Sequence, residues 1–167
     1  MANSIQMVYL ETSFISYLTA RPSRTIIAAA HQQITQDWWS RKRTTFELVI
    51  SELVVRECAA GDPEAARRRL DVIAGIGRLE INERVEQIAL GLVQRGLVPP
   101  QVAEDALHIA IAAAHGADYI LTWNFKHIAN PMMQRRIAGF LDEIDLPLPF
   151  ICTPEELLGE DDGTIDN

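Results

Sequence analysis

The chain has 167 residues, 48% of them hydrophobic, which is enough for one domain with a full core. Its formal net charge of -8 argues against a protein held to nucleic acid by bulk charge, although a local basic groove is compatible with it. The N-terminus does not resemble a signal peptide, no segment is long enough to span a bilayer, and Cys58 and Cys152 match no zinc spacing. We therefore expect a cytoplasmic protein with two buried thiols.

Short apolar runs alternate with helical patterns along the whole chain. In chain order, the sequence predicts a strand at 8–10, helices at 13–18 and 24–40, a strand at 46–50, helices at 52–60 and 64–74, a strand at 77–82, helices at 83–95 and 101–115, a strand at 119–122, a helix at 131–141, a strand at 149–152 and a closing helical turn from 153. Such alternation implies a parallel sheet covered on both faces. We expect a three-layer α/β/α domain at 1–158, with a mainly parallel sheet of about four to five strands, and an acidic, disordered tail at 159–167.

The first strand ends at a carboxylate. Glu11 follows the apolar run directly and is followed by two hydroxyl residues, Thr12 and Ser13. Ligands of parallel sheets gather outside the C-terminal ends of the strands, so an acid there is a candidate for chemistry. Asn124 follows the strand at 119–122 with the same layout. Two strand ends are thus expected to present oxygen ligands.

A second acid lies on an apolar helix face. Glu57 shares its face with Leu53 and Val54, its neighbours one turn earlier. Glu52, in contrast, forms an ordinary exposed pair with Arg56 four residues later. We assign Glu52 to the surface and Glu57 to a site, with a partly exposed acid at a helix edge as the alternative for Glu57.

The helix at 101–115 carries a third such acid. Asp105 shares its face with Val102, Ile109 and Ala112, whereas Glu104 belongs to a more polar strip. A buried ionised carboxylate is costly unless it is paired, hydrogen-bonded or bound to a metal. No Lys or Arg occurs from 96 to 121, so a cation or a distant side chain must compensate Asp105.

Oxygen ligands of this kind suit Mg²⁺ or Mn²⁺ better than zinc, which prefers nitrogen and sulfur. Three carboxylates in one pocket could not all stay ionised without a metal, because like charges raise each other's pKa. The sequence therefore predicts a metal site formed by Glu11, Glu57, Asp105 and Asn124.

These residues resemble the PIN-domain family and, within it, the VapC-like toxins and related single-domain nucleases. The similarity runs from Val8 to about Leu158 and rests on four segments in order, YLETS at 9–13, SELVVRE at 51–57, EDALHIA at 104–110 and LTWNF at 121–125. It implies the same four ligands, with Glu11 and Asn124 standing where the family usually has aspartate. It also implies one or two Mg²⁺ or Mn²⁺ ions, hydrolysis of RNA by metal-activated water, an antitoxin partner and a homodimer.

Neighbouring polar residues have supporting roles in this hypothesis. Thr12, Ser13 and Thr122 would hydrogen-bond the ligands, although Ser13 and Thr122 fit equally well as caps at strand ends. His108 lies one turn after Asp105 and is either a satisfied packing residue or a member of this supporting shell.

Several charged segments keep two interpretations. Lys126 and His127 would contact a phosphate backbone or belong to a solvated loop. The arginines at 67–69 are expected to pair with Glu64 and Asp71 on their own helix, while the basic clusters at 41–43 (RKR) and 135–136 (RR) could line a substrate path.

The leading hypothesis is a metal-dependent ribonuclease that acts as the toxin of a toxin–antitoxin pair. The alternative is a catalytically weak or inactive module of the same fold that binds RNA or a protein partner. A generic α/β hydrolase or phosphotransferase lacks support, because the chain has no GxSxG, P-loop or GxGxxG motif.

Overall fold

A five-stranded parallel sheet forms the centre of the computed structural model, which describes residues 4–159. The strand order is β3-β2-β1-β4-β5, so β1 lies in the middle and pairs with β2 and β4. Because all pairs are parallel, the C-terminal ends of the strands meet at one edge. The strands are β1 (Met7–Leu10), β2 (Glu47–Ser51), β3 (Gly77–Leu79), β4 (Tyr119–Leu121) and β5 (Phe150–Cys152).

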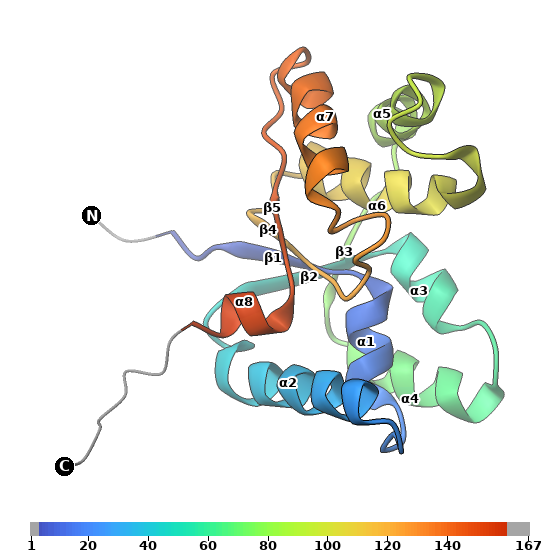
Figure 1. Ribbon diagram of the computed structural model, residues 1–167, viewed down its shortest axis with the longest axis vertical. Coiled ribbons are helices and arrows are strands. Elements are labelled where there is room, and N and C mark those ends of the chain that lie inside the picture. The colour runs from blue at the N-terminus through green and yellow to red at the C-terminus, as the bar shows by residue number, and fades with distance from the viewer. Residues whose placement is uncertain (1–3, 160–167) are drawn as a thin grey trace.

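Helices cover both faces of the sheet, which confirms the expected three-layer architecture (Figure 1). One layer contains α1 (Thr12–Thr19), α2 (Ile26–Lys42), α3 (Glu52–Cys58), α4 (Pro63–Ile73) and α8 (Pro154–Leu158). The other contains α5 (Glu83–Gln94), α6 (Ala103–Ala114) and α7 (Pro131–Asp142), with a short 3₁₀ turn, η1 (Pro100–Val102), before α6. The expected tail at 159–167 lies outside the described residues apart from Gly159.

Polar residues at the strand ends also start the helices that follow. Glu11 is the N-cap of α1 and accepts a hydrogen bond from the Ser13 amide at 3.0 Å. Ser51 caps α3 by accepting from the Val54 amide at 3.3 Å. Such caps satisfy amide groups that lack partners within the helix. The caps therefore fix side chains at the edge where the strands end.

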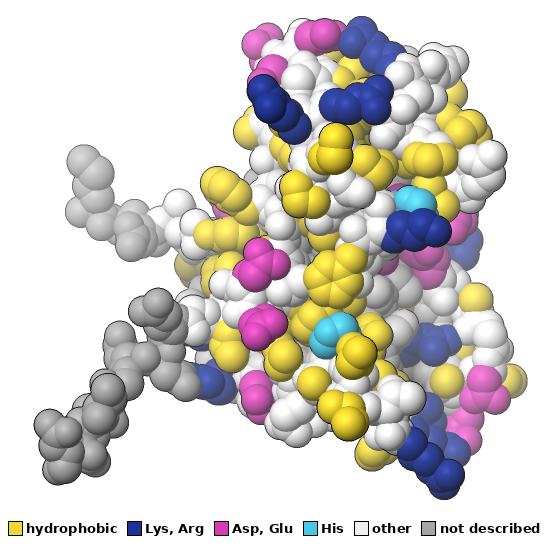
Figure 2. Space-filling view, viewed as in Figure 1, with side chains coloured by type: hydrophobic (Ala, Val, Ile, Leu, Met, Phe, Trp, Pro, Cys, Tyr) yellow, Lys and Arg dark blue, Asp and Glu magenta, His cyan; other side chains and the backbone are white. Residues whose placement is uncertain are grey.

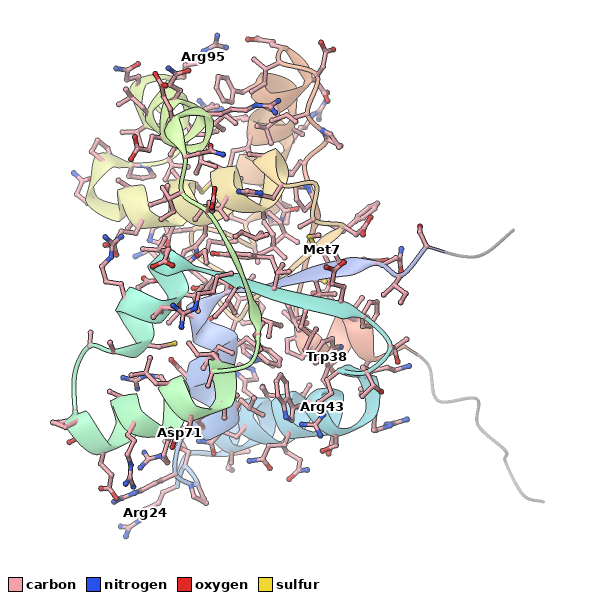
Figure 3. All side chains as sticks on the ribbon, turned by 180° about the vertical axis from the view of Figure 1, so that it is seen from behind. Met7, Arg24, Trp38, Arg43, Asp71 and Arg95 are labelled. Atoms are coloured by element: carbon pink, nitrogen blue, oxygen red, sulfur yellow. The ribbon has the colours of Figure 1, made fainter. Side chains whose placement is uncertain are left out.

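The core between α2 and the sheet is aromatic. Trp38 points from α2 into this layer (Figure 3), where its ring stacks on Phe46 and meets Phe14 edge-on. The neighbouring Trp39 is half-buried under the Arg43 guanidinium, 5.3 Å from the ring centroid. Trp38 is therefore part of the core, and Trp39 packs against it while partly exposed.

The two cysteines are buried and unpaired, as the sequence indicated. Burial raises the pKa of Cys58 to about 11 and that of Cys152 to about 12, which keeps both thiols protonated near neutral pH. Within residues 4–159, no helix has the length and apolar character needed to cross a membrane.

Candidate active site

The predicted acids gather around one buried histidine at the C-terminal edge of the sheet. Nε2 of His108 lies 2.6 Å from Glu57 Oε1 and 4.0 Å from Glu11 Oε1. Asp105, on the same helix as His108, is close enough for its charge to act on the imidazole. Asn124 joins the group through a hydrogen bond to Asp105. Sequence positions from two strand ends and two helices thus come together.

Glu11 is buried and its carboxylate is held on one side. Oε2 accepts hydrogen bonds from the Ser13 amide, the Ser13 hydroxyl and, at 2.8 Å, the Thr122 hydroxyl. Oε1 lies on the side of His108. Ser13 and Thr122 therefore contact the first acid directly, and Ser13 Oγ also accepts from the Trp123 amide at 2.8 Å.

The strand register changes the expected match between Glu11 and Asn124. Leu10 pairs with Leu121, so the residue of β4 that lies level with Glu11 is Thr122. Asn124 lies two residues further on, in a turn where its amide donates to Thr122 Oγ1 at 2.9 Å. The equal layout that the sequence indicated was wrong by two positions, because it compared distance along the chain instead of pairing across the sheet.

Both ends of the Asn124 side chain are in use. Its Oδ1 accepts from the His127 amide at 3.2 Å, and its amide group hydrogen-bonds the Asp105 carboxylate. A carboxylate can only accept, so Asn124 donates to it. The geometry favours a role for Asn124 in orienting Asp105.

A buried hydrogen-bond relay supports Glu57 from behind. His108, fully buried, contacts the Tyr9 hydroxyl through Nδ1 at 2.6 Å and Glu57 through Nε2. The Tyr9 hydroxyl reaches Ser51 Oγ at 2.8 Å, and Thr12 Oγ1 donates to Glu57 Oε1 at 2.7 Å. No sequence pattern marks Tyr9 as part of the site, because a tyrosine inside an apolar strand is typical of a core residue.

The ionisable groups of this relay shift each other's pKa values. Burial lowers the pKa of His108, but its hydrogen bond to Glu57 and the charges of Glu11, Glu57 and Asp105 outweigh burial and raise that pKa above its usual value. Burial raises the pKa of Glu57, but bonds from His108 and Thr12 lower it overall. The pair is therefore stabilised as imidazolium and carboxylate.

The two acids at the start of α6 differ as predicted, but the strip assigned to Glu104 is not polar. Its helix neighbours His108 and Ile111 are fully buried, while Glu104 itself is exposed. Glu104 lies in the first turn of α6, and its side chain borders, with Leu107, an apolar hollow between α5 and α6. Glu104 therefore stays on the surface.

Asp105 is half-buried and incompletely compensated. Burial raises its pKa, His108 and the Asn124 hydrogen bond lower it, Glu11 raises it again, and the net pKa is raised. The compensation thus comes first from a near neighbour on the same helix, His108, and then from the distant Asn124, and together they do not cancel desolvation. The ionised form of such a carboxylate would be stabilised by a further positive charge nearby.

Charged residues outside the site have ordinary structural roles. Glu52 is exposed as predicted, but its ion-pair partner is Arg78 at 3.9 Å, since β3 lies beside β2, and the expected Arg56 pair was wrong. The arginines of α4 do not pair with their own helix: Glu64 pairs with Arg21 at 2.7 Å. Arg68 and Arg69 donate to the backbone carbonyls of Thr19, Cys58 and Ala60.

No family model and no curated protein matches this chain. Solved structures do match. VapBC2 of Rickettsia felis, bound to a DNA fragment from its promoter, has a TM-score of 0.57 at 15% identity over 89% of this chain and 98% of that one. VapC20 of Mycobacterium tuberculosis, a sarcin–ricin loop cleaving toxin, has a TM-score of 0.57 at 15% identity over 74% and 95%. VapBC-1 of nontypeable Haemophilus influenzae has a TM-score of 0.54 at 16% identity over 90% and 99%. The chain therefore has the PIN-domain fold of the VapC toxins.

Proposed function

We propose that this protein is a metal-dependent endoribonuclease and the toxin of a toxin–antitoxin pair. The observation that carries the proposal is Asp105, a half-buried carboxylate whose pKa is raised by burial and by the charge of Glu11, at the edge where the strands end. Its fold is that of the VapC toxins, of which VapC20 cleaves the sarcin–ricin loop. Two acids close enough for one charge to act on the other at this edge are a reason to expect a cation.

The donor chemistry fits one hard cation at Glu11 and Asp105. Mg²⁺ is usually held by one or two carboxylates together with water and substrate phosphate, so two acids suffice. Within residues 4–159, however, no three His, Cys, Asp or Glu side chains lie together as a metal-binding group. Glu57 is turned toward His108 and Thr12, and Asn124 is occupied at both ends. This supports one ion in preference to two.

In this proposal, the residues of the site have different roles in the cleavage of RNA. A bound ion would polarise the phosphate and acidify its water. Glu57 stays ionised because His108 and Thr12 hold its Oε1, and among the described residues no donor engages its Oε2. That oxygen can accept a hydrogen bond from the attacking water and orient it. Asn124 keeps the Asp105 carboxylate in place.

The proposal extends to partners. Two of the solved structures contain VapBC assemblies, one of them with promoter DNA. We propose that this chain binds an antitoxin and forms a homodimer, and light scattering of the purified chain, alone and mixed with a candidate antitoxin protein, tests both. The cytoplasmic location stays a prediction.

A matched pair of variants tests the enzyme assignment. Purified wild type should cleave single-stranded RNA with Mg²⁺ or Mn²⁺ and stop in EDTA. The cleavage rate of Asp105→Asn should be lower by at least about 100-fold, which is the effect of losing one electrostatic contact to the transition state. The control is Glu104→Gln, which changes the exposed acid next to Asp105 in the chain. This variant should cleave like the wild type, because Glu104 lies outside the site. Activity that survives in Asp105→Asn or in EDTA would show that another site, or a contaminant, does the chemistry.

The alternative is a non-catalytic binding module, and it is favoured because no group of three His, Cys, Asp or Glu side chains lies together in the part of the chain that the structure describes. Calorimetric titration with Mn²⁺ separates the two. If the protein is the nuclease, the wild type and Glu104→Gln should bind Mn²⁺ with measurable heat. Asp105→Asn should bind less Mn²⁺ and release less heat than Glu104→Gln. A folded wild type that binds no Mn²⁺ at millimolar concentration and cleaves nothing supports the module.

A further inference from the structure

We propose that Phe125 is the stacking surface for an unpaired base of the RNA substrate, next to the phosphate that is cleaved. This inference rests on the proposed nuclease function and names its substrate class, which is single-stranded RNA. Phe125 lies one residue beyond Asn124, and its side chain is 52% exposed. What sets this ring apart from other exposed apolar side chains is its place in the chain, directly after a residue of the candidate site.

The ring is mounted on a rigid aromatic support. Trp123 beneath it is 6% exposed, and its Nε1 donates to Thr35 Oγ1 on α2 at 2.8 Å. Trp123 also stacks on His31 of the same helix, with ring centroids 4.1 Å apart and planes 18° apart. Phe125 meets Trp123 edge-on, with ring centroids 5.9 Å apart, and lies tilted to His31, with ring centroids 6.1 Å apart. These contacts hold Phe125 in place while leaving about half of it accessible, so stacking on it costs little conformational entropy.

The backbone places this support beside the acids. The Phe125 amide donates to the Trp123 carbonyl at 3.1 Å, and the amides of Ile128 and Ala129 return to the Asn124 carbonyl at 3.3 and 2.9 Å. The same Asn124 holds Asp105 through its side chain. The segment that presents the ring therefore cannot move far without moving the site.

Positive charge accompanies the ring. Lys126, the next residue, is exposed, and among the described residues no ion pair engages it. His127 lies close enough to Asp105 to act on its charge. In the view of Figure 2, hydrophobic side chains run down the middle of the molecule, and basic, histidine and acidic side chains all border them. In a chain of net charge -8, a cation beside an exposed ring suits a nucleotide, which pairs a flat base with a phosphate.

The occupant has to be an unpaired base. Stacking on an aromatic side chain needs a free face of the base, which loops and single strands offer and a continuous duplex does not. The support contributes only ring faces and no base-reading hydrogen bond at Phe125, so the preference is for strandedness and not for one base.

Binding to a short fluorescent single-stranded RNA tests this in the Asp105→Asn background, where the RNA stays intact. Phe125→Ala and Phe125→Leu should weaken binding by about 5- to 50-fold, the range of one lost stacking contact, whereas Phe125→Trp should bind like the parent. The control is Met132→Ala, which removes another exposed apolar side chain, 82% exposed, and should leave the affinity unchanged. A blunt duplex of the same sequence should bind weakly and equally in all variants.

The outcomes separate this inference from the nuclease assignment. If the wild type cleaves RNA but Phe125→Ala binds as tightly as the parent, or Phe125→Leu rescues as well as Phe125→Trp, base stacking is wrong while the enzyme assignment stands. If Phe125 controls RNA affinity and the wild type cleaves nothing, the stacking site stands and the nuclease fails. An RNA affinity that no Phe125 variant changes, together with lost antitoxin binding in Phe125→Ala, would assign the ring to a protein partner and overturn the inference.

Discussion

Removing the Tyr9 hydroxyl should expose how much the buried relay stabilises the fold. In Tyr9→Phe the ring and its packing remain, but the bonds to Ser51 at 2.8 Å and to His108 Nδ1 at 2.6 Å are lost. Ser51 keeps the Val54 amide as a donor, whereas His108 Nδ1 is left without a partner in a fully buried side chain. A buried polar atom left in this way costs about 1–3 kcal/mol.

We therefore expect Tyr9→Phe to lower the free energy of unfolding by about 2 kcal/mol. For a chain of this size, that corresponds to a fall in Tm of about 4–8 °C. Urea unfolding followed by tryptophan fluorescence measures the change, and an unchanged m value shows that the loss is one of stability alone.

Tyr17→Phe is the matched control. Tyr17 is half-buried on α1, and no hydrogen bond of its hydroxyl is found among the described residues, so the expected cost is below about 0.5 kcal/mol. A double variant with His108→Gln should lose less than the sum of the single losses, because the two residues share one bond. Equal losses in Tyr9→Phe and Tyr17→Phe, or full additivity with His108→Gln, would refute the relay.

Two further changes test charge and packing. The pKa of His108 is raised from 6.5, so the stability that its charge gives the folded protein is fully present below pH 6.5 and is lost as pH rises through the folded pKa. The pKa of Glu57 is lowered from 4.5, so the stability that its charge gives is present above pH 4.5 and is lost as pH falls through the folded pKa. The stability advantage of the wild type over His108→Gln should thus be largest between 4.5 and 6.5 and shrink toward alkaline pH in urea titrations; a constant difference would contradict the charged pair. Gly91→Ala should destabilise the protein in thermal melts, because the new Cβ would lie 2.7 Å from Phe140 Cζ. Its control is Gly139→Ala on α7, where a Cβ meets nothing within 4 Å and should stabilise the protein by about 0.5–1 kcal/mol. A higher Tm in both variants would mean that the Phe140 ring moves aside freely.

Much of this protein was determined by the sequence alone. Unbroken apolar runs that alternate with helical patterns are sufficient for a parallel α/β sheet, and a parallel sheet collects the residues that follow its strands at one edge. Glu11 was identifiable on that basis, and Glu57 and Asp105 were identifiable because acids on apolar helix faces need a partner. These signals are local, spanning a strand or two turns of helix.

Pairing across the fold was decided only by the tertiary structure. His108 and Tyr9 are 99 residues apart in the chain, and His108 and Glu57 are 51 apart, so no local pattern could show that a buried histidine links a strand tyrosine to an acid. The register of β1 against β4 placed Thr122, and not Asn124, level with Glu11, because it depends on which backbone groups pair. Sequence periodicity reports which face a side chain takes, while its partners follow from packing between distant elements.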